Sequence, residues 1–190
     1  PFDVEDVRAR VSLTLSEYVV SQLPSLKAIS SDVVVLHELL TAFTSGVTRL
    51  RPVLAWWGWR AAGRTDDQAM IRAATSLELL QACALIHDDV MDGSDTRRGA
   101  PSIHRSLEAL HAKSGWRGSA EEFGVAGAIL LGDLCLSWSD QLLFESGLSA
   151  EALIRTKSIF DITRTELMAG QYLDVVEQAR ADIDADRALL

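Results

Sequence analysis

The segment from Leu85 to His104 concentrates charged residues directly after a long apolar stretch. It holds four aspartates and two adjacent arginines, namely Asp88, Asp89, Asp92, Asp95, Arg97 and Arg98. Negative charges repel one another, and the C-terminal end of a helix already disfavours them, so a bound cation is expected here. Asp88 and Asp92 are four residues apart, which places their carboxylates on one helix face as candidate metal ligands.

The residue types in this segment favour magnesium and a phosphorylated substrate. The candidate ligands are all carboxylate oxygens, with no cysteine and no histidine at zinc spacing, and such hard ligands suit Mg²⁺. Mg²⁺ commonly completes its coordination with substrate phosphates, and the guanidinium groups of Arg97 and Arg98 are suited to bind phosphate oxygens in pairs. The alternative is a solvated acidic helix end followed by a basic turn. An EF-hand is excluded, because its alternating ligands and distant glutamate do not occur here.

The same segment resembles the first aspartate-rich motif of the trans-isoprenyl diphosphate synthases, also called polyprenyl synthetases. That motif reads DDxxD, then RRG and a Pro-Ser/Thr-x-His tail, and the sequence here reads DDVMD, RRG and PSIH. Three further elements match in the family's order: GVTRLRP from Gly46, GDLCLSWSDQLL from Gly132, and ELMAGQYLD from Glu166 to Asp174. The resemblance extends over most of the chain and is strongest to geranylgeranyl diphosphate synthase-like members.

The resemblance implies a Mg²⁺-dependent prenyltransferase that condenses an allylic diphosphate with isopentenyl diphosphate. Asp88 and Asp92 would bind Mg²⁺ and, together with Arg97, would be the catalytic residues. Arg97 would bind the allylic diphosphate. The other implied substrate-binding residues are Arg51, Gln81 and Arg98 for isopentenyl diphosphate, with Gln171 and Asp174 facing the same cavity. In the family's scheme of ionisation, condensation and elimination, Mg²⁺ and arginines stabilise the departing diphosphate.

One position departs from the family pattern. The lysine that family members use to hold isopentenyl diphosphate is replaced by Thr48, and the second glycine by Val47. A threonine donates only a neutral hydrogen bond, which is roughly half as strong as a charge-assisted one. We therefore expect weaker binding of isopentenyl diphosphate, with partial compensation by the adjacent Arg49.

Product length in this family depends on the residues just before the first aspartate, which form the floor beneath the growing chain. Cys83 and Ala84 stand five and four residues before Asp88, and both are small. An aromatic side chain there would fill the space that further carbons need. Leu80 lies about one turn deeper and is a candidate stop. The hypothesis is a product longer than farnesyl diphosphate, with geranylgeranyl diphosphate as the leading candidate.

Length and composition limit the class of protein. We expect residues 1–190 to form a single domain with a sizeable core. The net charge of −9, with no basic stripe, argues against nucleic-acid binding. No uncharged run approaches the roughly eighteen residues that span a bilayer, so no transmembrane segment is predicted. Cys83 and Cys135 lie in apolar contexts, which predicts buried free thiols and a reducing, cytoplasmic location.

Apolar residues recur every three to four positions through most of the chain, and no segment alternates like a strand. The predicted fold class is therefore all-α, with an antiparallel helix bundle around a central cavity. Helices are predicted over residues 3–22, 31–46, 51–62, 66–90, 120–145 and 149–179. The first should end at Pro24, and residues 93–101 and 113–119 should form a loop and a polar connector.

The family's second aspartate-rich motif does not occur among residues 1–190, so we expect it in a C-terminal part beyond Leu190. The resemblance also implies a homodimer. Two alternatives stay open. A class I terpene cyclase shares DDxxD and an all-α core, but it lacks the paired arginines and the GxxRxRP element. A non-catalytic or regulatory synthase subunit is favoured by Thr48 and by the missing second motif.

Overall fold

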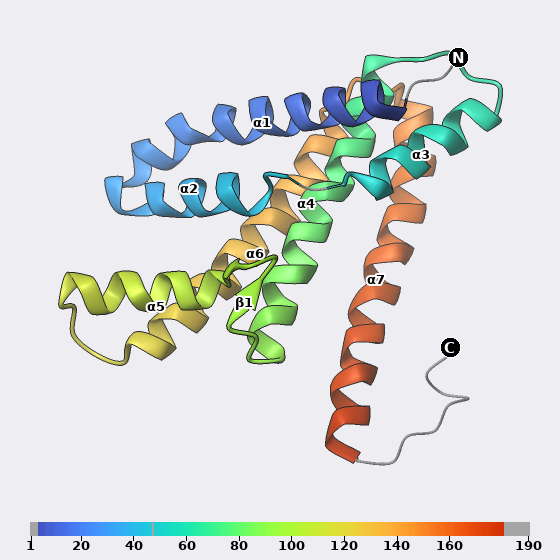
Figure 1. Cartoon of the computed structure of the whole chain (residues 1–190). Coiled ribbons are helices and arrows are strands. Elements are labelled where there is room, and N and C mark those ends of the chain that lie inside the picture. The colour runs from blue at the N-terminus through green and yellow to red at the C-terminus, as the bar shows by residue number, and fades with distance from the viewer. Residues whose placement is uncertain (1–3, 47, 181–190) are drawn as a thin grey trace. The chain divides into compact units, whose positions relative to one another are not determined.

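The computed structural model describes residues 4–46 and 48–180, and the chain forms two compact units, Pro1–Ser149 and Ala150–Leu190. The first unit contains α1 (Val4–Ile29), the 3₁₀-helix η1 (Ser31–Val33), α2 (Val34–Phe43), α3 (Leu50–Ala61), α4 (Gln68–Met91), strands β1 (Thr96–Arg97) and β2 (Ala100–Pro101), α5 (Ile103–Ser114) and α6 (Ala120–Phe144). The second unit contains α7 (Ala150–Arg180), as Figure 1 shows. The predicted all-α class is confirmed, whereas the single domain and the central cavity stay predictions.

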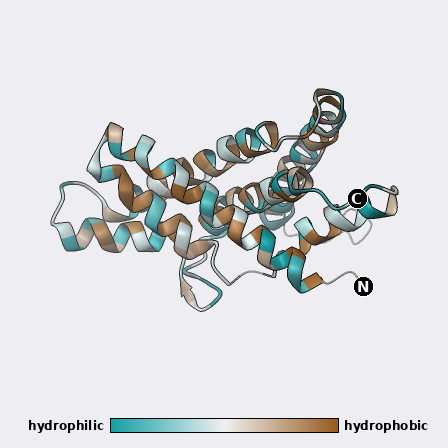
Figure 2. Ribbon diagram, turned by 90° about the horizontal axis from the view of Figure 1, so that it is seen from above, coloured by the Kyte–Doolittle hydropathy of each residue, from teal (hydrophilic) through white to brown (hydrophobic). Residues whose placement is uncertain are grey.

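Helix α4 is the central element of the first unit and packs against α1, α3 and α6. Its N-terminus is capped by Asp67, whose carboxylate accepts a hydrogen bond from the Ala69 N–H at 2.9 Å. Leu79, Cys83 and Ile86 are buried in the main hydrophobic core, which also includes residues of α1, α5 and α6. The helices of this unit carry both hydrophobic and hydrophilic residues along their length (Figure 2), so each can bury one side and expose another.

By length and composition alone, α4 could also cross a membrane. However, 61% of its most apolar 18-residue window is buried inside the protein. Two carboxylates of this helix, those of Glu78 and Asp89, are buried as well. Burial among neighbouring helices, with charged groups paired inside, is the pattern of a core helix.

Helices α4 and α6 lie side by side and approach closely near the acidic end of α4 (Figure 1). Gly132 of α6 faces His87 of α4, and a Cβ atom at Gly132 would lie 2.1 Å from the His87 Nε2 atom. The same nitrogen lies 3.1 Å from the carbonyl oxygen of Ile129. Glycine at the first position of the GDxL element therefore leaves the space that the imidazole occupies, and a larger residue there would displace His87. His87 directly precedes Asp88, so this contact fixes the helix position next to the candidate site.

The predicted end of the first helix at Pro24 is wrong, because α1 continues to Ile29. A proline inside a helix removes one backbone hydrogen bond and crowds the preceding turn. The turn that follows buries Leu26, which is 8% exposed and belongs to the main core. This apolar contact offsets the cost of the proline.

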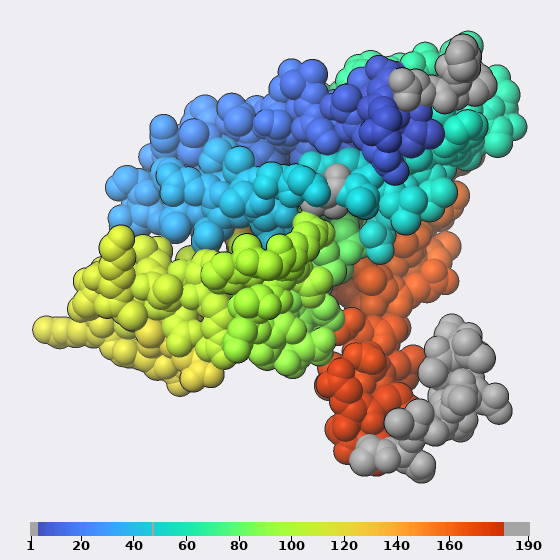
Figure 3. All heavy atoms as spheres, in the orientation of Figure 1, coloured from blue at the N-terminus to red at the C-terminus, as the bar shows by residue number. Residues whose placement is uncertain are grey.

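The segment predicted as a loop contains a small hairpin in which β1 and β2 pair antiparallel. Its turn residues, Arg98 and Gly99, have φ angles of 54° and 79°, and two positive φ values are typical of a type I′ hairpin turn. Helix α5 follows after Ser102, where the sequence prediction had no helix. On the face shown in Figure 3, α2 lies between α1 and the region of the hairpin and α5.

Candidate functional site

The acidic motif lies at the C-terminal end of α4. Asp88 and Asp89 belong to its last turns, and Asp92 is the C-cap residue. The Asp92 N–H donates a hydrogen bond to the Asp88 carbonyl oxygen at 2.9 Å, so the helical register extends through the motif. Asp88 and Asp92 therefore lie on the same face of the helix, whereas the Asp89 side chain turns inward and is only 1% exposed.

Arg97 of the hairpin binds the first two aspartates. Its Nε atom donates to the two carboxylate oxygens of Asp89 at 2.8 and 2.9 Å, and its Nη2 atom donates to Oδ2 of Asp88 at 2.9 Å. The hydrogen bond to Asp89 is the main cause that raises the pKa of Arg97, with a smaller contribution from Asp88. Asp89 has no role assigned by the sequence analysis, and the structure shows it as the carboxylate that orients Arg97.

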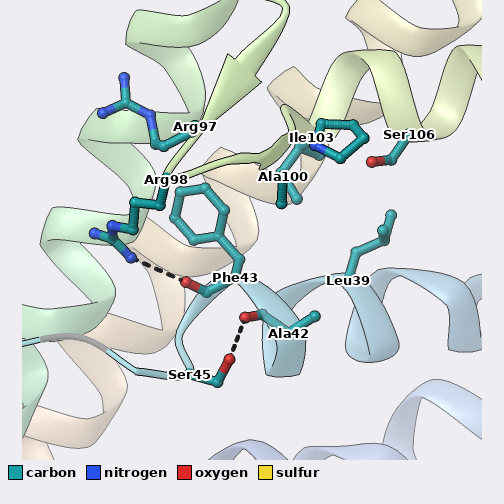
Figure 4. Close-up of a pocket in the computed structure, with 10 residues that line it drawn as sticks. Leu39, Ala42, Phe43, Ser45, Arg97, Arg98, Ala100, Ile103 and Ser106 are labelled. Atoms are coloured by element: carbon teal, nitrogen blue, oxygen red, sulfur yellow. Dashed lines mark hydrogen bonds between the residues drawn. The ribbon is translucent and has the colours of Figure 1, made fainter.

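The two adjacent arginines point in different directions. Arg97 is the last residue of β1, whereas Arg98 is the first residue of the turn and has a φ of 54°, so their side chains leave the backbone in different directions (Figure 4). Arg97 reaches the aspartates of α4, whereas Arg98 reaches the end of α2. The Arg98 Nη1 atom donates to the Phe43 carbonyl oxygen at 3.3 Å, and its guanidinium carbon lies 5.8 Å from the centre of the Phe43 ring.

Arg98 takes part in the lining of two cavities. One has a volume of about 300 Å³ and lies between the end of α2, the hairpin and the start of α5, with Phe43, Arg97 and Ile103 among its lining residues. The other is much smaller and is lined by Gln81 of α4 together with Phe43 and Arg98. The structure thus brings Gln81 and Arg98 together, two of the residues expected to bind isopentenyl diphosphate.

Arg49, which was expected to compensate in part for the missing lysine, lines the small cavity together with Gln81 and Arg98, and this role stays a prediction. Its guanidinium is buried, and all three of its nitrogens bind protein groups. Nη1 lies 2.6 Å from Oε2 of Glu78, Nη2 lies 2.7 Å from the Thr44 carbonyl oxygen, and Nε lies 3.1 Å from the Ser12 hydroxyl. Arg49 directly precedes α3 and connects α1, the end of α2 and α4. It is a buried structural residue and not an exposed surface cation.

Thr48 and Arg51 are the two other residues of the GVTRLRP element considered for substrate binding, and both are exposed. Arg51 lies in the first turn of α3, and it is not among the residues that line the small cavity with Gln81 and Arg98. The role of Arg51 in binding isopentenyl diphosphate stays a prediction.

The predicted product-length residues differ in their surroundings. Leu80 and Cys83 are buried, whereas Ala84 is half-buried. The Cys83 Sγ atom lies 3.8 Å from the Nδ1 atom of His87, and burial raises the pKa of this thiol to about 11. Cys83 is packed inside the core, so Ala84 is the position of the three with the most room for a larger side chain.

Gln171 and Asp174 lie in the second unit, on α7. Gln171 is half-buried and Asp174 is exposed, and the Asp174 carboxylate accepts a hydrogen bond from the Gln178 side chain at 2.8 Å. Three residues separate them along the helix, so they share a face. Their expected part in the substrate cavity stays a prediction.

Glu78 and Phe43 belong to the site although the sequence analysis did not select them. Glu78 carried a usable signal, because a carboxylate on an otherwise apolar core helix requires a cationic partner when buried. It lies three residues before Gln81, on the same side of α4. Phe43 could not be selected in this way, because an aromatic residue at the end of an amphipathic helix usually belongs to the hydrophobic core.

Magnesium has a limited set of protein ligands in this site. Among residues 4–46 and 48–180, the structure places no group of three or more His, Cys, Asp or Glu side chains where they could hold a metal ion. A pair such as Asp88 and Asp92 still fits Mg²⁺, since this ion usually keeps several waters and binds one or two carboxylates together with substrate phosphates. The donor set is also free of sulfur and imidazole.

Comparison with known proteins gives the family. The family model for polyprenyl synthetase matches residues 33–189. The chain belongs to the polyprenyl synthetase family. Among curated relatives, a geranylgeranyl diphosphate synthase of Sulfolobus acidocaldarius is 33% identical over 158 residues, which are 82% of this chain and 43% of that protein. A geranylfarnesyl diphosphate synthase of Natronomonas pharaonis is 33% identical over 124 residues, or 65% of this chain and 32% of the relative.

A solved structure agrees with this assignment. The geranylgeranyl pyrophosphate synthase of Corynebacterium glutamicum, complexed with isoprenyl diphosphate and magnesium, is 38% identical and superposes with a TM-score of 0.91. The match covers 97% of this chain and 54% of that one. The isoprenoid-synthase type of fold predicted from the sequence is therefore confirmed. The chain spans about half or less of the length of the relatives it matches.

The buried ion pair between Arg49 and Glu78 yields a stability prediction. Their side chains are 6% and 5% exposed, and removing one charge leaves the other without compensation in a low-dielectric interior. We expect Glu78→Gln to lower the free energy of unfolding by about 3 kcal/mol, measured by urea denaturation. As a matched control, Glu151→Gln removes the exposed partner of Arg155, where the side chains are 67% and 78% exposed, and it should change stability by less than about 0.5 kcal/mol. Equal effects of the two substitutions would contradict a structural role of the buried pair.

Proposed function

We propose that the chain is part of a Mg²⁺-dependent trans-prenyltransferase that adds isopentenyl diphosphate to an allylic diphosphate. The observation that carries the proposal is the placement of adjacent arginines on two sides of one hairpin. Arg97 lies beside the acidic face of α4, and Arg98 lies beside Gln81. Two neighbouring anion subsites suit a reaction between two diphosphate substrates. Membership of the polyprenyl synthetase family supports the same activity.

In this proposal Asp88 and Asp92 hold Mg²⁺, which supplies positive charge to the departing diphosphate. The buried carboxylate of Asp89 would retain Arg97 through its Nε atom when Asp88 turns to the metal. The Nη2 atom now donates to Asp88 and also lies 2.7 Å from Oδ1 of Asp89, so the N–H released by Asp88 would be available to the allylic diphosphate. Arg97 would thus exchange one carboxylate for a phosphate without moving its anchored end, and such preorganised donors can stabilise a developing charge without large rearrangement.

Arg98 and Gln81 would bind isopentenyl diphosphate, with Arg51 as a further contact. Gln171 and Asp174 would contribute to the same cavity from α7. Thr48 lacks the charge of the family's lysine, so we expect weaker binding of isopentenyl diphosphate than in lysine-containing members. Thr48 in place of the family's lysine is the observation that favours the second candidate, a regulatory or non-catalytic subunit.

The proposed product is geranylgeranyl diphosphate or a longer homologue. The names of the relatives, geranylgeranyl and geranylfarnesyl diphosphate synthases, support this range. The small side chains of Cys83 and Ala84 support it as well, because neither blocks chain growth. We further propose a homodimer located in the cytoplasm; the two buried free cysteines suit a reducing compartment.

The activity is tested by product analysis of the full-length protein. Protein, Mg²⁺ and isopentenyl diphosphate are incubated with each allylic diphosphate in turn, and products are identified by mass spectrometry. We expect products beyond farnesyl diphosphate, and a rate reduced at least about a hundredfold in Asp88→Ala because a charge-stabilising group at the metal is lost. Absence of product from the full-length wild-type protein would contradict the synthase and favour the regulatory subunit. A cyclised hydrocarbon instead of a longer diphosphate would favour a terpene cyclase.

Product length is tested at Ala84. Because this position is half-buried, Ala84→Phe should fold and should shorten the main product by at least one isoprene unit, since the ring occupies space needed by the growing chain. Chain length is read by mass spectrometry, with thermal denaturation as a check on folding. Ala84→Val adds only two carbons and serves as the control that should keep the wild-type product. An unchanged product from a folded Ala84→Phe protein would remove Ala84 from the product-length residues.

A further inference from the structure

The C-terminal end of α2 holds two arginines that are far apart in the sequence. The Phe43 carbonyl oxygen accepts from Arg98 at 3.3 Å, and the next carbonyl oxygen, that of Thr44, accepts from Arg49 at 2.7 Å. The last carbonyl groups of a helix have no intrahelical partner, and they form the negative end of the helix dipole. Arg98 and Arg49 therefore supply hydrogen-bond donors to two carbonyl groups at the end of α2. These hydrogen bonds in turn hold the two guanidinium groups in place.

Both arginines have an unusual backbone conformation. Within residues 4–46 and 48–180, Arg49 and Arg98 are the only non-glycine residues with positive φ, and both have a φ of 54°. Side chains disfavour this left-handed region, and such residues persist where their surroundings hold them. Both side chains are held at the end of α2, a contact that glycine could not make.

The Phe43 side chain adds a second contact to Arg98. The Arg98 guanidinium lies 5.8 Å from the centre of the Phe43 ring, within the range of a cation–π interaction. Figure 4 shows the ring beside the Arg98 side chain, with the hydrogen bond to the Phe43 carbonyl below it. Phe43 thus holds the guanidinium through its backbone and its ring at once. Phe43 and Arg98 also line the same two cavities.

The opposite wall of the small cavity is fixed from the same helix end. Arg49, held by the Thr44 carbonyl, pairs with Glu78, which lies three residues before Gln81 on α4. The end of α2 is therefore connected to Arg98 directly, and to the turn that carries Gln81 through Arg49 and Glu78, which also line this cavity. A shift of this helix end would move both groups relative to each other.

We propose that Phe43 is a positioning residue for Arg98 and thereby sets the affinity with which Arg98 and Gln81 bind isopentenyl diphosphate. This inference rests on the proposed function and adds a residue outside its sequence motifs. Phe43 orients the Arg98 guanidinium toward the cavity shared with Gln81 and away from the acidic cluster that binds Arg97. Phe43 and Arg97 line the cavity of about 300 Å³ together. However, the hydrogen bond and the ring contact of Phe43 are made with Arg98, whereas Arg97 binds Asp88 and Asp89, so a change at Phe43 is expected to affect the allylic subsite less.

The experiment compares Phe43→Leu with Phe43→Tyr in the full-length protein. Leucine keeps an apolar side chain but loses the aromatic face, whereas tyrosine keeps the face and can direct its hydroxyl into the adjacent cavity of about 300 Å³. We expect Phe43→Leu to raise the KM for isopentenyl diphosphate about two- to fivefold, because this is the effect of losing one exposed cation–π contact. The KM for the allylic substrate should stay within about twofold, and Phe43→Tyr should restore wild-type values.

A matched control separates the loss of the Phe43–Arg98 contact from the effect of losing any aromatic side chain. Phe123→Leu makes the same change in the cluster with His111 and Trp116, on another part of the first unit, and it should leave both KM values unchanged. An unchanged KM for isopentenyl diphosphate in Phe43→Leu, or equal losses in Phe43→Leu and Phe43→Tyr, would overturn the role of Phe43. Failure of the wild-type protein to form product would instead overturn the proposed function, and the positioning role with it.

Discussion

The salt bridge between Arg97 and the inward-facing Asp89 is the interaction on which the arrangement of the site depends. The Asp89 side chain is 1% exposed, and an unpaired carboxylate in the interior would cost several kcal/mol. Arg97 removes that cost only if the hairpin docks on the end of α4. The position of the hairpin is thus determined by the acidic motif itself, and the same pairing leaves Asp88 and Asp92 on the face that can bind a metal ion.

The position of the hairpin also determines where the second arginine lies. Arg98 is the first residue of the type I′ turn that follows β1, and this turn places it at the end of α2. There the carbonyls of Phe43 and Thr44 receive Arg98 and Arg49. One helix end and one helix face therefore organise the two proposed substrate subsites separately, although the two arginines of the hairpin are neighbours in sequence.

The helical class and most helix positions could be predicted because apolar spacing is a local property of the sequence. The failures occur where distant contacts decide the structure. Pro24 is accommodated because Leu26 is buried in a core assembled from other helices. The hairpin forms because Arg97 has a partner on α4. Arg49 looked like an exposed cation of a helix start, and only Glu78 and Thr44, 29 and 5 residues away, make it a buried structural residue.

Part of the candidate site could also be predicted from local features of the sequence. Charged residues at short spacing, such as Asp88, Asp92 and the two arginines, identified the acidic and cationic groups and agreed with the family. Their partners could not be read from spacing, since Asp89 and Glu78 act through the direction of their side chains into the core. Phe43 is more difficult still, because its function as an anchor depends on a backbone carbonyl that every residue possesses.

The central claim is that Asp88 and Asp92 hold a magnesium ion that shares an allylic diphosphate with Arg97. The most direct test is calorimetric titration of the full-length protein with an unreactive thiolo analogue of an allylic diphosphate, in Mg²⁺ and again in excess chelator. The account predicts binding that weakens at least about tenfold without Mg²⁺, as expected when a metal bridges carboxylate and phosphate. The same affinity with and without Mg²⁺ would contradict it.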